Sequence, residues 1–202
     1  KNMSKKTDKL IALLAEHYPS PNCAFIPELR AGTGFGRDSR ADAVAMNLWP
    51  SMGLELVGFE LKTSRTDWLR ELKQPNKADP IKQFCDRWYL VIDDPEIVKH
   101  YPSLGETELP TDWGLMQPDY SSWPYKIKVT TEAPKLTPQP IDRLFLASIM
   151  RRASNSHGEI MLNGKESKAR KAGMSDEREL SLIYARARHR VAGEIRKAIR
   201  GN

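Results

Sequence analysis

Hydrophobic and polar positions change their spacing several times along the first third of the chain, and each change predicts a different element. Residues 4–18 begin with polar side chains, continue as an apolar-rich stretch and end at a Tyr-Pro pair, as in a helix stopped by proline. Residues 24–30 and the glycines at alternate positions after them predict a strand that runs into a flexible loop. Residues 41–48 and 54–62 predict two strands joined by a turn with proline and glycine, and we expect them to pair as a hairpin.

Two helix starts and a buried strand follow this hairpin. Ser64 with an aspartate three residues later is typical of a helix cap, and the apolar face of this helix ends before Pro75. Asp79 followed by proline predicts a second helix start. The apolar residues after it have helical spacing as far as Trp88: they are Ile81, Phe84, Cys85 and Trp88. Residues 89–92 predict a buried strand, so the order is helix, three strands, helix, strand, an α/β arrangement.

The remaining residues predict two outer strands and a helical C-terminal extension. Residues 113–116 predict a short strand, and residues 125–131 alternate apolar and polar side chains as an outer or edge strand does. A Pro-rich stretch then closes the core, and residues 141–153 predict a helix. Residues 155–173 predict a mobile linker and residues 175–200 a terminal helix with an apolar stripe. We therefore divide the chain into a core at residues 4–134 and a basic helical extension at residues 135–202.

Charge is distributed unevenly between these two parts. The net charge is +6 and the isoelectric point is near 9.3. Residues 143–202 hold 14 Lys and Arg against 6 Asp and Glu, a net of +8, which leaves 18 against 20, a net of −2, for residues 1–142. The excess positive charge is therefore C-terminal, which favours a polyanionic partner such as DNA.

Several classes of protein do not fit the composition. No apolar run approaches the roughly 20 residues that cross a bilayer, and the first residues are too polar for a secretory signal, so we expect no membrane partner and a cytoplasmic or nucleoid location. Cys23 and Cys85 lack the spacing of a structural zinc site, and we expect reduced cysteines that serve packing. The four histidines likewise give little support to a histidine-based metal nuclease.

Candidate chemistry is concentrated in the predicted hairpin. Because side chains alternate along a strand, Glu60 and Lys62 point to one side, and a hairpin partner can bring Asp42 beside them. Two carboxylates suit Mg²⁺, which takes oxygen ligands, and a lysine two residues from such a ligand can hold or help deprotonate an attacking water. The trio therefore suits metal-assisted hydrolysis of a phosphodiester. The alternative is a surface salt bridge, since Glu-x-Lys occurs by chance in many proteins.

The hairpin pattern resembles the core of the PD-(D/E)XK nucleases. Asp42 is followed across a hairpin by Glu60-Leu61-Lys62 and then by a helix rich in Trp and Leu, and residues 25–93 are also similar to small bacterial and phage proteins of the MmcB-like DNA-repair group. The resemblance implies a restriction-endonuclease-like core and a Mg²⁺-dependent deoxyribonuclease that also accepts Mn²⁺, with a role in phage or bacterial DNA processing or repair. It implies metal ligation by Asp42, Glu60 and the backbone carbonyl of Leu61. The proline of the family name is absent, since Ala41 precedes Asp42.

Two further residues are candidates for accessory roles. Glu28, on the strand before the hairpin, could add an outer metal ligand or orient a water, and an ion pair with Arg30 is the alternative. Gln83 occupies a helix position at which related nucleases often place a polar residue facing the cleft, so the resemblance implies an accessory role for it.

Basic residues on the core and on the terminal helix could bind phosphates, with a solvated helix face as the alternative. The predicted nucleic-acid-binding residues are Arg30, Arg37, Arg40, Arg65, Arg70, Lys73, Arg186, Arg190 and Lys197. The apolar stripe of the terminal helix could instead pack on the core or form a homodimer. A hypothesis from another class is a catalytically silent DNA-binding or recruitment module of the same fold. DNA and RNA, and endonuclease and exonuclease action, are all compatible with these residues.

Overall fold

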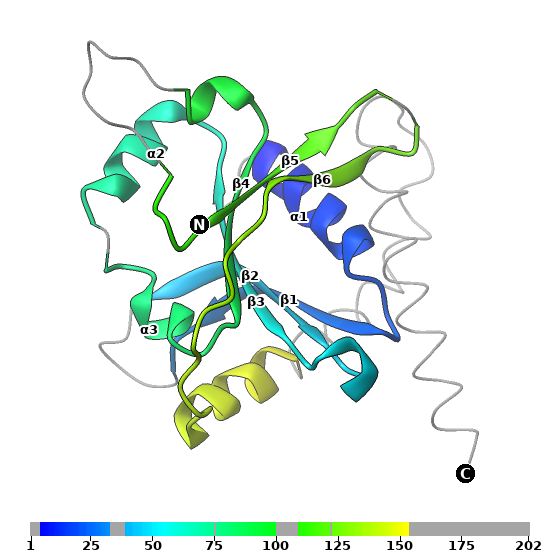
Figure 1. The fold of residues 1–202 in the computed structure, drawn as a ribbon, viewed down its shortest axis with the longest axis vertical. Coiled ribbons are helices and arrows are strands. Elements are labelled where there is room, and N and C mark those ends of the chain that lie inside the picture. Colours follow the sequence, from blue (N-terminus) through cyan, green and yellow to red (C-terminus); the bar gives the residue numbers. More distant parts are fainter. Residues whose placement is uncertain (1–4, 33–38, 75, 100–108, 122, 154–202) are drawn as a thin grey trace, which may run out of the picture.

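Six strands form one mixed sheet with helices on both faces, so the predicted α/β class is confirmed (Figure 1). This computed structural model describes residues 5–32, 39–74, 76–99, 109–121 and 123–153. The strands are β1 (Cys23–Arg30), β2 (Arg40–Asn47), β3 (Leu56–Lys62), β4 (Arg87–Ile92), β5 (Gly114–Asp119) and β6 (Lys126–Thr131). The helical elements are α1 (Lys5–His17), α2 (Arg65–Leu72), α3 (Asp79–Lys82), the 3-10 turns η1 (Pro50–Met52) and η2 (Pro95–Ile97), and a helix at residues 143–153.

The strands lie in the sheet in the order in which they occur in the chain. β1, β2 and β3 pair antiparallel through short connections, as the predicted hairpin requires. β4 and β5 are parallel to β3, and β6 returns antiparallel to β5. All seven residues of β3 are buried, because this strand has neighbours on both edges and helices over both faces.

Each face of the sheet has its own hydrophobic cluster. α1 covers one face with Leu10 and Leu14, which pack with Phe59 of β3. α2, α3 and the helix at residues 143–153 cover the other face, where Trp68 and Phe145 are fully buried. Alternation along β3 therefore gives the odd-numbered side chains to the α1 face and the even-numbered ones to the α2 face. Glu60 and Lys62 consequently lie beneath α2.

Two predicted helices differ from the observed ones. The helix predicted from Asp79 has only four residues, and Trp88 belongs to β4, so the prediction that helical spacing continues to Trp88 is wrong. The cause is a long-range contact: Trp88 pairs with Gly58 of β3 in a parallel ladder. A Cβ atom on Gly58 would lie 2.2 Å from the Trp88 ring, so this close approach requires glycine.

The helix at residues 143–153 packs on the sheet, although the sequence places it in the extension. The ring of Phe145 stacks on Phe84 with centroids 4.4 Å apart. Ser148 Oγ donates a 2.8 Å hydrogen bond to the carbonyl of Arg30, and Arg152 Nε donates to that of Pro27 at 2.9 Å. Residues 135–153 therefore complete the core. The remainder of the predicted extension, with the linker at 155–173 and the terminal helix at 175–200, lies outside the described residues, as does the predicted loop at 33–38.

Within the described residues, no helix is both long enough and apolar enough to span a membrane.

Candidate active site

Asp42 occupies the point at which β2 and β3 separate. The ladder between these strands runs from Met46 opposite Leu56 to Ala43 opposite Phe59. Beyond it, Asp42 Oδ2 accepts a 2.8 Å hydrogen bond from the backbone N–H of Leu61. The carboxylate therefore takes the place of a strand partner. Since the N–H and C=O of one strand residue leave on the same edge, the Leu61 carbonyl also faces the gap beside Asp42.

Glu60 and Lys62 lie side by side on the α2 face of β3, as alternation predicts. Their exposed fractions are only 5% and 8%. Lys62 Nζ donates hydrogen bonds to Glu60 Oε1 and, at 2.8 Å, to Glu71 Oε2. The structure thus brings the predicted catalytic residues into one buried cluster, because Asp42 also lies close enough to affect the ionisation of Glu60.

Glu71 and Lys77 complete this cluster, and the sequence interpretation missed both. Glu71 is buried on α2 and accepts hydrogen bonds from Lys62 and, at 2.6 Å, from Lys77. Lys77 Nζ also lies 3.5 Å from Glu60 Oε1. One signal for Glu71 exists: it follows Trp68 by three residues and so shares the buried face of α2. Lys77 lies in a turn after α2, for which no such periodicity exists.

Burial determines the protonation of the two carboxylates. Desolvation raises the pKa of Glu60 to about 7, and the negative charge of Asp42 adds to this effect while Lys62 opposes it. Desolvation also raises the pKa of Asp42, against the hydrogen bond from Leu61 and the positive charges of Lys62, Arg40 and Lys77. Desolvation therefore outweighs the nearby positive charges at both carboxyl groups, and a bound cation would favour their ionised forms.

Lys62 stays protonated at neutral pH. Burial by itself would lower the pKa of Lys62, but attraction to Glu60 and hydrogen bonds to Glu60 and Glu71 outweigh it and raise that pKa. A lysine with a raised pKa is almost wholly an ammonium group at neutral pH, and this form has no lone pair with which to accept a proton. Lys62 is therefore suited to hold a water or a phosphate oxygen, and is poorly suited to act as a general base.

The donor set is compatible with one hard divalent cation held by few protein ligands. Asp42 and Glu60 supply carboxylate oxygens, and the Leu61 carbonyl faces the same gap. No group of three or more His, Cys, Asp or Glu side chains suited to a metal occurs in the described part of the chain. Mg²⁺ is commonly bound by one or two carboxylates and completes its shell with water and substrate oxygens, so a pair of carboxylates meets its needs. The observation that fits the ion is the convergence of two partly desolvated carboxylates, whose raised pKa values a nearby cation would lower.

The two predicted accessory residues lie in different places: Glu28 stands across from Asp42 in the β1–β2 register, whereas Gln83 lies at the end of α3. Glu28 has a positive φ of 54° at a break in the β1–β2 ladder, and its carboxylate lies 3.9 Å from Arg152. The ion-pair partner of Glu28 is therefore Arg152, and the alternative pair of Glu28 with Arg30 is not formed. Gln83 is exposed and donates to the carbonyl of Pro80 at 3.1 Å.

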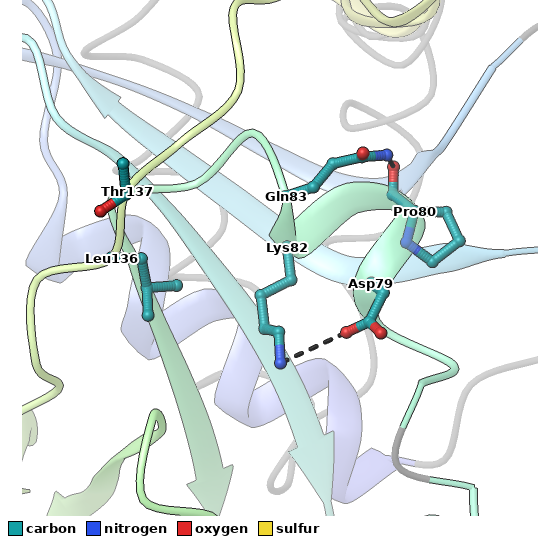
Figure 2. A pocket seen from close by; sticks show the side chains of 6 residues that line it. All are labelled: Asp79, Pro80, Lys82, Gln83, Leu136 and Thr137. Atoms are coloured by element: carbon teal, nitrogen blue, oxygen red, sulfur yellow. Dashed lines mark hydrogen bonds and ion pairs between the residues drawn. The ribbon is translucent and has the colours of Figure 1, made fainter.

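Gln83 lines a separate, shallow pocket on the α3 side, shown in Figure 2. The residues around it are Asp79, Pro80, Lys82, Gln83, Leu136 and Thr137. The ammonium of Lys82 lies 3.3 Å from Asp79, so the charge in this pocket is already paired. None of these residues belongs to the cluster around Glu60, so the structure gives Gln83 no place beside the carboxylates.

The predicted phosphate-binding residues divide into three groups. The first consists of Arg65 and Arg70, whose side chains already have partners in the structure. Arg65 Nη1 donates hydrogen bonds to the carbonyls of Glu96, Ile97 and Lys99, at 3.2, 3.2 and 2.7 Å, which ties α2 to η2. This contact gives Arg65 a structural role. Arg70 forms a 3.0 Å exposed ion pair with Asp67 on its own helix, in agreement with the solvated-face alternative.

The second group consists of three exposed residues: Arg30, Arg40 and Lys73. Of these, Arg40 lies close enough to lower the pKa of Asp42, so its positive charge acts at the site. The third group lies outside the described residues: Arg37, Arg186, Arg190 and Lys197. The predicted homodimer contact through the terminal helix also lies outside them.

Comparison with known proteins gives a fold and no function. No protein-family model matches the chain, and no curated protein matches it. Among solved structures, the SPO1766 protein of unknown function from Silicibacter pomeroyi is similar in fold, with a TM-score of 0.53 and 20% sequence identity. The match covers 86% of this chain and 100% of that chain. The chain therefore shares an α/β fold with a protein whose function is itself unknown.

Proposed function

We propose that this chain is a Mg²⁺-dependent deoxyribonuclease with a restriction-endonuclease-like core of the PD-(D/E)XK type. The observation that carries the proposal is the convergence of half-buried Asp42 with buried Glu60 and Lys62 where β2 and β3 separate. The element order supports the finer fold assignment: a helix, three antiparallel strands, a helix and a parallel strand surround the Asp and Glu-x-Lys positions. We expect Mn²⁺ to support the same activity in place of Mg²⁺.

Each residue of the cluster then has a distinct role. Asp42, Glu60 and the Leu61 carbonyl would hold the metal ion, which supplies Lewis-acid stabilisation of charge on the phosphate. Lys62, protonated, would hold the attacking water or a phosphate oxygen with the N–H that Glu60 and Glu71 do not use. Glu71 keeps the Lys62 ammonium directed towards the carboxylates through its 2.8 Å hydrogen bond. Hydrolysis adds the hydroxyl of water to phosphorus, breaks one P–O bond and delivers the proton to the leaving oxygen.

The experiment is a cleavage assay on plasmid, linear duplex and single-stranded DNA, and on RNA of the same sequence, with Mg²⁺ or Mn²⁺. Asp42→Asn keeps an oxygen that can accept the Leu61 hydrogen bond, and Glu60→Gln keeps the shape of Glu60. Both should lose activity by about a hundredfold or more, because each removes a charged metal ligand. Glu55→Gln is the matched control, since Glu55 precedes the opposite end of β3 and pairs with Arg87. Activity retained in both Asp42→Asn and Glu60→Gln would refute the assignment.

One observation favours a second candidate, a DNA-binding or recruitment module without catalysis. The Glu60 carboxylate is already contacted by the ammonium groups of Lys62 and Lys77, so two lysines could serve as permanent counter-ions. In that case DNA binding would be unchanged by divalent metal and by Asp42→Asn or Glu60→Gln, and no product would form. Binding that depends on metal in the native chain, together with product formation, excludes it.

A further inference from the structure

Lys77 is the exposed member of the charge cluster at the candidate site. Its Nζ lies 2.6 Å from Glu71 Oε2 and 3.5 Å from Glu60 Oε1. Its side chain is 43% exposed, whereas that of Lys62 is 10% exposed. Movement of Lys77 into water therefore vacates little buried space, whereas movement of Lys62 would empty a buried position. The two lysines make similar contacts but differ in their freedom to break them.

The backbone around Lys77 supports this difference. The residue lies after α2 and before α3, in a turn built from i to i+3 hydrogen bonds. Its N–H donates to the carbonyl of Gln74 at 3.1 Å, and no ladder of a strand or helix includes it. A side chain that leaves such a turn disturbs no regular element. Lys62, at the end of β3, is held by pairing with β4.

The charges of the cluster give Lys77 a role. Asp42, Glu60 and Glu71, when ionised, carry three negative charges, and Lys62 supplies one positive charge. The remaining charge of −2 equals that of one divalent cation with the sign reversed. Lys77 compensates half of it in the structure, and a cation placed beside Glu60 would meet the like charge of Lys77 within a few ångströms.

We propose that Lys77 is a displaceable counter-ion of the site, which holds the Glu60 and Glu71 carboxylates until a divalent cation binds and thereby sets the affinity for that cation. The inference rests on the proposed function, because it takes Asp42 and Glu60 as the metal ligands. It adds a residue that determines metal affinity without itself being a ligand. Lys77 is then a positioning residue, since it acts through Glu60 and Glu71.

Metal affinity, measured without DNA, tests this role. Mn²⁺ is titrated into the full chain at constant pH, and the free ion is followed by electron paramagnetic resonance. Lys77→Met removes the charge and should bind Mn²⁺ about three- to fivefold more tightly, the effect of one partly exposed ion pair on the equilibrium. Lys77→Gln, a polar neutral variant, should behave in the same way. Lys77→Arg keeps the charge and should stay within about twofold of the native chain.

Lys128→Met is the matched control, because Lys128 is an exposed lysine of β6, which β4 and β5 separate from β3, and its loss should leave the affinity unchanged. If the native chain binds Mn²⁺ and both neutral Lys77 variants bind it equally or more weakly, the role of Lys77 is overturned and the proposed function is not. Absence of Mn²⁺ binding in the native chain and in both variants contradicts the proposed function as well. Two results together support both proposals: both neutral Lys77 variants bind Mn²⁺ more tightly than the native chain, and Glu60→Gln abolishes the binding.

Discussion

Replacement of Glu60 by glutamine should make the metal-free protein more stable at alkaline pH and leave it little changed at acidic pH. In the native chain, desolvation and the charge of Asp42 raise the pKa of Glu60 from 4.5 to about 7. The folded state therefore holds the proton more tightly than the unfolded state does. The stability that this group contributes is present below pH 4.5 and is lost as the pH rises through 7.

The magnitude follows from the size of that shift. Each pKa unit corresponds to about 1.4 kcal/mol, so ionisation of buried Glu60 costs the folded state about 3 kcal/mol in total. Glutamine does not ionise, so Glu60→Gln avoids this cost. The free energy of unfolding of the variant minus that of the native chain should increase by about 3 kcal/mol between pH 4.5 and pH 8. Lys62 keeps Glu71 as a partner in the variant, so its charge is not left unpaired.

Urea denaturation in the presence of EDTA, at closely spaced pH values, measures this difference. Glu55→Gln is the control with the opposite sign. Ion pairs of Glu55 with Arg87 and Lys135 lower its pKa in the folded state despite partial desolvation, so its contribution is present at neutral pH and lost in acid. If the difference in free energy of unfolding between Glu60→Gln and the native chain is constant or falls with pH, the pKa of Glu60 is not raised in the folded state.

Three further predictions concern the packing and the chemistry of the core. Phe145→Ala should destabilise the chain by about 3 to 5 kcal/mol in urea denaturation, because the ring is fully buried, whereas Leu146→Ala, at a 46% exposed position, should cost less than about 1 kcal/mol. Arg65→Met should cost about 1 to 3 kcal/mol through its lost carbonyl contacts, and a selective loss of DNA affinity with unchanged stability would contradict this structural role. Burial raises the pKa of the Cys85 thiol to about 12, so Ellman's reagent at pH 8 should modify it only upon unfolding, and rapid labelling of the native chain would contradict this burial.

The elements that carry local signals were predictable from the sequence. Ser64 caps α2 by accepting the N–H of Asp67, as the spacing of the two residues indicates. Alternation predicted β6, whose Ile127 is buried while its lysines are exposed. The same rule placed Glu60 and Lys62 on one face of β3. Each of these predictions depends on residues fewer than ten positions apart, where backbone geometry alone fixes which side chains meet.

The parts that could not be predicted depend on contacts between distant segments. Trp88 continues the helical spacing of Ile81 and Cys85, yet the parallel ladder with β3 draws it into a strand. A short helix and a following strand that face the same core produce the same apolar spacing over a few residues. Lys77 joins the site because α2 crosses above β3, which no local pattern records.

The two edges of β3 connect the site to the chain in different ways. Its antiparallel edge joins β2 through a short turn, and this hairpin alone brings Asp42 close to Glu60. Its parallel edge joins β4 through a crossover that includes α2 and α3 and supplies Glu71 and Lys77. Local hairpins form in microseconds, whereas pairing across a long crossover must first overcome the entropy of loop closure. Asp42, Glu60 and Lys62 should consequently come together early in folding, and Lys77 should arrive only when the crossover docks.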